Sequence, residues 1–156
     1  LEKVFNVSII TQNVDDLHER AGSSKVLHLH GQLFKARSEK NPNLIVPWKK
    51  DIRLGDLAED GAQLRPHVVW FGEAVPAMDK AVQLVSEADL LIVVGTSLLV
   101  YPAAGLIHYC SSDCQIHYID PSPNEAILDL GSRWHLWRGT AAEELPLLVK
   151  SLIKKA

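Results

Sequence analysis

Short apolar segments that alternate with helical ones constrain the fold of this 156-residue chain more than any other feature. Runs rich in β-branched and aliphatic residues predict strands, and these are Val4–Thr11, Lys25–His30, His67–Phe71, Asp89–Gly95 and Gln115–Asp120, with Trp134–Gly139 as a weaker sixth. Strands that are apolar throughout and alternate with helices are covered on both faces. The pattern therefore predicts an α/β fold with a parallel sheet and helices on both faces.

Three segments carry helix signals. Residues Ala77–Ala88 have helical periodicity, and Pro102 stands where the first turn of another helix tolerates proline. Thr140 is followed three residues later by Glu143, which forms a capping box for a last helix. These signals place a helix after most of the later predicted strands.

The segment Ser38–Leu64 is polar, contains prolines and glycines, and shows no sustained period. It predicts either a small lobe or an irregular insertion, since structureless loops of this length are uncommon unless functional. We expect one domain over residues 1–156, in which residues 38–64 form the insertion.

The net charge and the number of cysteines limit the classes of partner and of metal site that the sequence predicts. A net charge of −3 gives no general attraction to nucleic acid or to anionic membranes, and no apolar run is long enough to span a bilayer. The two cysteines, Cys110 and Cys114, supply at most half of a structural zinc site. They are expected to be free thiols of a cytoplasmic protein.

Polar residues follow two of the predicted strands. Gln12, Asn13 and Asp15 come directly after the first strand, and Gly95–Ser97 end the most hydrophobic one. The carboxyl ends of parallel strands are where open α/β sheets bind ligands. An Asx turn or helix cap at Asp15, and a plain strand-to-helix turn at Gly95–Ser97, remain alternatives.

Two further stretches suggest chemistry. His28 and His30 lie two residues apart, so in a strand they share one face, and Gly31 follows the second histidine. The alternative is a half-exposed strand with two solvated histidines. The segment "VVWFGE" places bulky apolar residues beside Gly72, as a groove for an extended peptide requires, although such residues are more often core.

Four motifs in this order, "TQNVDDLHERAG", "HLHG", "RPHVVWFGE" and "GTSLLVYPAAG", resemble the sirtuin family of NAD-dependent protein deacylases. The third is most similar to the bacterial and mitochondrial branch that includes desuccinylases. The resemblance implies the larger part of a sirtuin-type, Rossmann-like domain. It also implies NAD as co-substrate and an acyl-lysine protein or peptide as substrate, with no nucleic-acid or membrane partner.

Residue roles follow from the resemblance alone. His30 matches the catalytic base, which takes a proton from a ribose hydroxyl while the acyl group passes to ADP-ribose and nicotinamide is released. Gly31 leaves room beside cofactor and substrate, and His28 keeps a structural role. The implied cofactor contacts are Gln12, Asn13, Asp15, Gly95, Thr96, Ser97, Tyr118, Asp120 and Ala141. The implied peptide contacts are Val69, Phe71, Gly72, Glu73 and Leu98 to Val100.

The chain departs from the family pattern in three ways. The glycine-rich opening segment that cradles the cofactor phosphates is absent, so we expect these 156 residues alone to bind NAD weakly and to show no turnover. The segment Ser38–Leu64 contains no cysteine, so we expect a zinc-free lobe. Tyr118 stands where many members have an asparagine at the ribose-contacting strand end, and Asp120 keeps an acidic residue two positions on.

Two alternative functions follow from these departures. One is a binding module that recognises NAD or ADP-ribose without turnover. The other is a different Rossmann-like nucleotide-binding domain, in which His30 has no assigned role.

Overall fold

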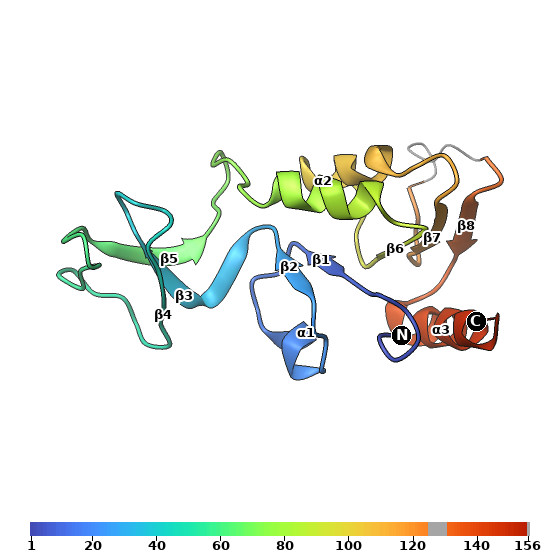
Figure 1. Ribbon diagram of the computed structural model, residues 1–156, viewed down its shortest axis with the longest axis horizontal. Coiled ribbons are helices and arrows are strands. Elements are labelled where there is room, and N and C mark those ends of the chain that lie inside the picture. Colours follow the sequence, from blue (N-terminus) through green and yellow to red (C-terminus); the bar gives the residue numbers. More distant parts are fainter. Residues whose placement is uncertain (125–130, 156) are drawn as a thin grey trace. The chain divides into compact units, whose positions relative to one another are not determined.

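The computed structural model describes residues 1–124 and 131–155, and the chain forms two compact units (Figure 1). The larger unit comprises Leu1–Val7 and Met78–Ala156, and the smaller unit comprises Ser8–Ala77. Each unit is described by itself below.

The larger unit contains a parallel sheet of three strands. These are β6 (Leu90–Val94), β7 (Gln115–Ile119) and β8 (Trp134–Trp137), in the order β6-β7-β8. Val94 pairs with Ile119, and Ile119 pairs with Trp137, so the three strands end at one edge. The unit also contains α2 (Met78–Ser86), the 3-10 helix η1 (Ala103–Tyr109) and α3 (Ala141–Lys155). The parallel sheet predicted from the sequence is confirmed for these strands.

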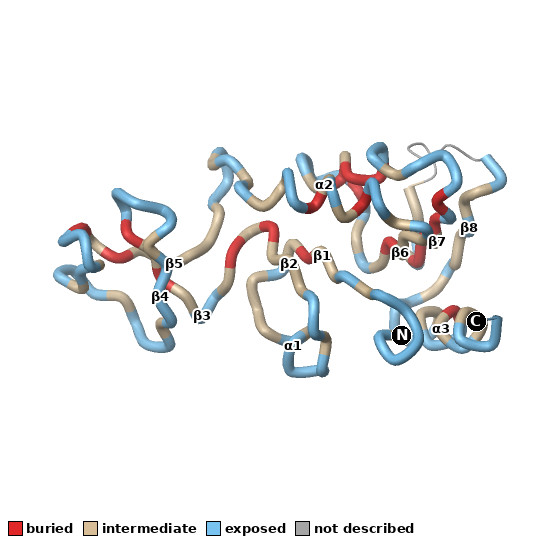
Figure 2. The backbone as a smooth tube through the Cα atoms, viewed as in Figure 1, coloured by how far each residue is buried: buried red, intermediate tan, exposed pale blue. Residues whose placement is uncertain are grey.

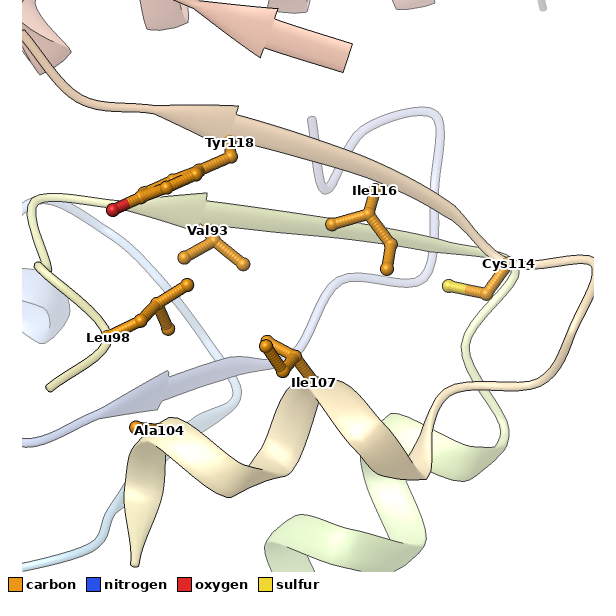
Figure 3. Packing of buried hydrophobic residues seen from close by; sticks show 7 residues of the cluster. All are labelled: Val93, Leu98, Ala104, Ile107, Cys114, Ile116 and Tyr118. Carbon is orange, nitrogen blue, oxygen red and sulfur yellow. The ribbon is translucent and has the colours of Figure 1, made fainter. Parts of the chain in front are cut away.

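Alternation along β7 separates a core face from an opposite face. Ile116 and Tyr118 are fully buried and lie in one cluster with residues of β6, of η1 and of the segment after β6 (Figure 3). On the other face, the rings of His117 and His135 stack at 4.6 Å, and the Trp137 indole donates to His117 Nδ1 at 3.0 Å. Every second side chain of β7 therefore serves the apolar core.

The start of α3 shows one of the two bonds of the predicted capping box, from the Thr140 N–H to the Glu143 side chain, while the Glu143 N–H donates to the Thr140 carbonyl. The Glu143 carboxylate accepts the Thr140 backbone N–H at 3.2 Å and the Thr140 hydroxyl at 2.7 Å. These bonds lower the pKa of Glu143, the hydroxyl contributing most. An acidic side chain in the first turn also suits the positive end of the helix.

The smaller unit contains two sheets. In one, β1 (Ile9–Thr11) and β2 (Val26–His28) are parallel, with the short helix α1 (Leu17–Arg20) between them in sequence. The other is antiparallel, with the order β4-β3-β5, and is formed by β3 (Gly31–Ser38), β4 (Ile45–Pro47) and β5 (Leu64–Val68). All of β4 is exposed, whereas β3 is buried at Gly31, Ala36 and Ser38 (Figure 2).

Two strand predictions are corrected here, and one strand was not predicted. The run Val4–Thr11 contributes only its last three residues to β1. The run His67–Phe71 is not part of a parallel sheet: β5 begins at Leu64, pairs antiparallel with β3 and ends at Val68. Strand β3 was not predicted, because its pairing with β5 is non-local and its outward side chains blur the alternation expected of a strand.

The polar segment after β3 is ordered by buried and bridging side chains. Ser38 is 1% exposed, and its hydroxyl donates to Asp60 at 2.7 Å and accepts the backbone N–H groups of Lys40 and Asn41 at 3.1 Å. The Gln63 amide donates to the Arg53 carbonyl at 3.0 Å and accepts the Gly55 N–H at 2.9 Å. Hydrogen bonds of this kind replace the apolar core that the segment lacks.

No helix among the described residues has both the length and the apolar character needed to cross a membrane.

Candidate functional site

His30 lies in the turn between β2 and β3. Strand β2 ends at His28, so the strand alternation that would align the two histidines stops before His30. Its backbone carbonyl accepts the Val69 N–H at 2.9 Å, and its side chain is half-buried. No hydrogen bond to the His30 imidazole occurs among the described residues. The backbone is therefore anchored while both ring nitrogens stay open to a ligand or a proton.

Gly31 is required by the packing of two strands. Its φ is +85°, and an added β-carbon would collide with the His67 carbonyl oxygen and lie 2.8 Å from the carbonyl carbon. Gly31 also pairs with Val68 across β3 and β5. The expected space beside a ligand is thus occupied, on this side of Gly31, by the backbone of β5.

His28 is fixed at both ring nitrogens. Nδ1 lies 2.9 Å from the Asn13 carbonyl oxygen, and Nε2 lies 2.8 Å from Glu19 Oε1. The His28 side chain is only 5% exposed, and its hydrogen bond is the main cause of the lowered pKa of Glu19. His28 therefore ties β2 to the segment that follows β1, which is the structural role expected for it.

The polar residues after β1 mostly shape their own loop. Thr11 Oγ1 accepts the Asn13 N–H at 3.1 Å, and Asp15 Oδ1 accepts the Leu17 N–H at 3.1 Å at the start of α1. Asp15 thus makes the local turn that the sequence left as an alternative. Gln12 is half-buried and Asn13 is exposed, so their amides are accessible from solvent.

The segment Val69–Glu73 is held by its last residue. The Glu73 carboxylate lies 2.6 Å from one Arg65 guanidinium nitrogen and 3.3 Å from Arg37, and it accepts the Trp70 N–H at 3.0 Å. The bond from Arg65 is the main cause of the lowered pKa of Glu73. With the carboxylate so occupied, Glu73 orders the loop, and Phe71 remains fully exposed beside Gly72.

Two residues of this arrangement, Arg37 and Arg65, were not among the candidates from the sequence. Arg65 stands at the head of the quoted motif "RPHVVWFGE", and its charge within an apolar run was the available signal. Their pairing with Glu73 depends on the antiparallel pairing of β3 and β5, which the sequence pattern did not reveal.

In the larger unit, Gly95, Thr96 and Ser97 form an open turn after β6. Gly95 has a φ of +66°, and a β-carbon added there would meet no atom within 4 Å. Thr96 Oγ1 accepts the Leu98 N–H at 3.2 Å, and Ser97 is exposed. Accessible backbone and a hydroxyl at the carboxyl edge of a parallel sheet fit a phosphate or a ribose.

The predicted peptide contacts after this turn separate into two kinds. Leu98 is 5% exposed and belongs to the hydrophobic cluster of Figure 3, despite a positive φ of 55°. Leu99 and Val100 are 62% and 49% exposed. The structure thus places the Leu98 side chain in the core and leaves only the two following side chains accessible.

Tyr118 lies near the carboxyl end of β7, and Asp120 directly follows that strand. Tyr118 is fully buried, and its hydroxyl donates to the Thr96 carbonyl at 3.0 Å. Asp120 is half-buried, and its carboxylate accepts the Ser122 N–H at 2.7 Å. Ala141 is the exposed first residue of α3. The sheet edge therefore brings together the turn after β6, Tyr118 and Asp120.

This edge fits the ADP-ribose part of NAD. The backbone at Gly95 is open, Ser97 offers a hydroxyl, and the Asp120 carboxylate retains oxygen atoms that can accept from sugar hydroxyls. No group of three or more His, Cys, Asp or Glu residues that could hold a metal ion is found within residues 1–124 and 131–155. The zinc content of the purified protein stays a prediction.

Comparisons with known proteins agree with this picture. A family model described as "Sir2 family" matches residues 1–102. The chain is 62% identical over 128 residues to an NAD-dependent protein deacylase of Helicobacter pylori, covering 82% of this chain and 56% of that protein. A protein of the same description from Bacteroides thetaiotaomicron is 47% identical over 159 residues, covering 98% and 67%.

Solved structures give the same result. A Sir2 homolog–NAD complex matches with a TM-score of 0.78 at 38% identity, covering 96% of this chain and 59% of that one. A Sir2–p53 peptide–NAD+ complex matches with a TM-score of 0.73 at 29% identity, covering 96% and 65%. The chain thus spans about half the length of the curated Helicobacter relative. Each match covers most of the present chain.

Proposed function

This chain belongs to the Sir2 family, and from that premise we propose that it serves the NAD-dependent removal of acyl groups from protein lysine side chains. The observation that carries the proposal is His30, a half-buried imidazole whose backbone is anchored to Val69 while its ring is free among the described residues. An imidazole is the side chain most often used as a general base toward a hydroxyl proton.

NAD, when bound, supplies the ADP-ribose that accepts the acyl group and the nicotinamide that leaves. In the proposal, a ring nitrogen of His30 takes the proton of a ribose hydroxyl. Gln12, Asn13 and Asp15 lie around the nicotinamide ribose. Further cofactor contacts are assigned to Gly95, Thr96, Ser97, Asp120 and Ala141.

The residues assigned to the acyl-lysine peptide are half-buried or exposed. In the smaller unit, the proposal uses Val69, Phe71 and Gly72, with Glu73 holding the loop in shape. In the larger unit, it uses the exposed Leu99 and Val100. Apolar side chains there would carry the lysine methylenes and exclude bulk water.

The proposal also keeps the expected organisation and location. We treat residues 1–156 as one catalytic domain with residues 38–64 as an insertion. We place the protein in the cytoplasm, where Cys110 and Cys114, which form no disulfide in the structure, would stay reduced.

The test is nicotinamide release from NAD by the intact gene product, with acetyl-lysine and succinyl-lysine peptides offered separately. Changing His30→Ala should lower kcat roughly 100- to 10,000-fold, the range for loss of a general base. The matched variant His28→Ala should lower it much less, because the His28 ring is already bonded to Asn13 and Glu19. Equal losses would remove the distinct role of His30, and absence of release by the wild type would overturn the function.

A further inference from the structure

A buried phenol lies under the turn that follows β6. The Tyr118 side chain projects from β7 across the end of β6, toward the segment that carries Leu98 (Figure 3). Its hydroxyl donates to the Thr96 carbonyl at 3.0 Å, and its oxygen is hydrogen-bonded by the backbone of Asn124. One side chain therefore connects the segments after two neighbouring strands.

The turn above this phenol has an uncommon backbone. Gly95 and Leu98 both have positive φ values, 66° and 55°, and for leucine this conformation is strained. The Leu98 N–H donates to Thr96 Oγ1 at 3.2 Å, and the Leu98 side chain is buried in the cluster that contains Tyr118. Such strain persists only where the surroundings determine the conformation. Here the surroundings are Tyr118 and the core beneath the turn.

We propose that Tyr118 is a positioning residue for the cofactor site, where its hydroxyl holds Thr96 and Asn124 so that the Gly95–Ser97 turn keeps the shape that binds ADP-ribose. Tyr118 is fully buried, so it acts through Thr96 and does not contact the ligand. The inference rests on the proposed function for where the ligand binds. It replaces the expectation that Tyr118 itself contacts the cofactor.

The chemistry of the phenol supports this role. Burial raises the pKa of Tyr118, so the hydroxyl keeps its proton and donates throughout the neutral range. Removing the hydroxyl leaves the Thr96 carbonyl and the Asn124 N–H without this partner in a part-buried place. The turn can then leave its strained conformation, and the ligand has to restore it on binding.

The experiment compares ADP-ribose binding by the wild type, Tyr118→Phe and the control Tyr109→Phe in the intact gene product, using calorimetry. Tyr109 lies in the same unit and is 52% exposed. We expect Tyr118→Phe to weaken ADP-ribose binding about five- to tenfold, as loss of one hydrogen bond does, and Tyr109→Phe to leave it unchanged. In steady-state assays, KM for NAD should rise while KM for the peptide stays the same.

A second measurement needs no variant and covers the case in which Tyr118→Phe does not fold. Because coupling is reciprocal, ADP-ribose should slow hydrogen exchange of the Leu98 and Asn124 amides in the wild type. Equal binding by wild type and Tyr118→Phe, a parallel rise of both KM values, or unchanged Asn124 exchange overturns the inference alone. Absence of ADP-ribose binding by the wild type overturns the proposed function and the inference with it.

Discussion

Among the described residues, the larger unit buries a cluster of aliphatic and aromatic side chains that includes Ile116 and Tyr118, whereas the hydrophobic residues buried in the smaller unit are Leu29, Ala36, Ala62 and Leu64. Two of these four are alanines, which bury little apolar area. The smaller unit instead depends on Ser38, Gln63 and Glu73, each with several hydrogen bonds.

This difference in what stabilises each unit affects two loops that carry candidate site residues. These are the segment Val69–Glu73 in the smaller unit and the turn Gly95–Ser97 in the larger unit. An apolar core stabilises without direction, and Tyr118 adds one neutral hydrogen bond to it. Polar anchors such as Glu73 fix direction, and loss of one partner leaves the other unpaired. An added side chain at a tightly packed backbone position, loss of a hydrogen bond, a change of pH or a change of salt should therefore alter the stability of the two units by different amounts.

The largest difference is expected at two glycines with positive φ. Gly31→Ala forces a β-carbon into the backbone of His67, so we expect a loss of about 4 kcal/mol or more in the free energy of unfolding. Gly95→Ala meets open space and adds only the strain of its φ, about 1–2 kcal/mol. Urea unfolding of both variants measures this. Equal losses would mean that the backbones of β3 and β5 can move apart at Gly31 at little cost in free energy.

A smaller loss is expected at Ser38. Ser38→Ala removes the acceptor of two backbone N–H groups and the donor to Asp60, so stability should fall by about 1–3 kcal/mol. The exposed Ser112→Ala in the larger unit is the control and should change stability by less than about 0.5 kcal/mol.

The same unfolding measurement also tests whether residues 38–64 bind a structural metal ion. If hydrogen bonds hold this lobe, a chelator should not change the unfolding of the wild type. Metal analysis should then find no zinc bound by residues 38–64. Stoichiometric zinc there would contradict the inference that a segment without cysteine binds no zinc. It would also contradict the conclusion that the hydrogen bonds of Ser38 order the segment.

The sequence predicted the larger unit well because its signals are local. The run Asp89–Gly95 contains β6, Gln115–Asp120 contains β7, and the capping box at Thr140 begins α3 within one residue. Each of these depends on a pattern within a few neighbouring residues. The polar turn at Gly95–Ser97 follows from the same local pattern.

The smaller unit was predicted less well because its structure depends on partners far along the chain. The need for glycine at position 31 comes from the His67 carbonyl, and Glu73 is held by Arg37, 36 residues away. No local pattern reports such pairs. Tyr118 likewise could be seen as a departure from a family pattern, but its bond to Thr96 follows only from the sheet register.

The two loops should respond to opposite changes of pH. The pKa of Glu73 is lowered below its ordinary 4.5, so its contribution to stability is present above that value and is lost as pH falls through the folded-state pKa. The pKa of Tyr118 is raised above 10.0, so its contribution is present below pH 10 and is lost as pH rises through the folded-state pKa. Urea unfolding across the pH range tests both directions.

Matched variants isolate each group in this experiment. The stability difference between wild type and Glu73→Gln should shrink on acidification and stay constant in alkali. The difference between wild type and Tyr118→Phe should stay constant in acid and shrink above pH 10. If both differences shrank in the same direction, the contrast between a charged anchor and a neutral one would be wrong.

Salt should produce the smallest effect and the sharpest distinction between the loops. The Glu73 side chain is 32% exposed, and raising the salt to about 1 M shortens the screening length from about 10 Å to about 3 Å. The ion pairs of Glu73 with Arg65 and Arg37 should weaken, so the stability difference between wild type and Glu73→Gln should decrease. The difference for Tyr118→Phe should not change, because neither the phenol nor the Thr96 carbonyl is charged. A salt-independent Glu73 difference would show that its hydrogen bond to the Trp70 N–H, and not its charge, holds the loop.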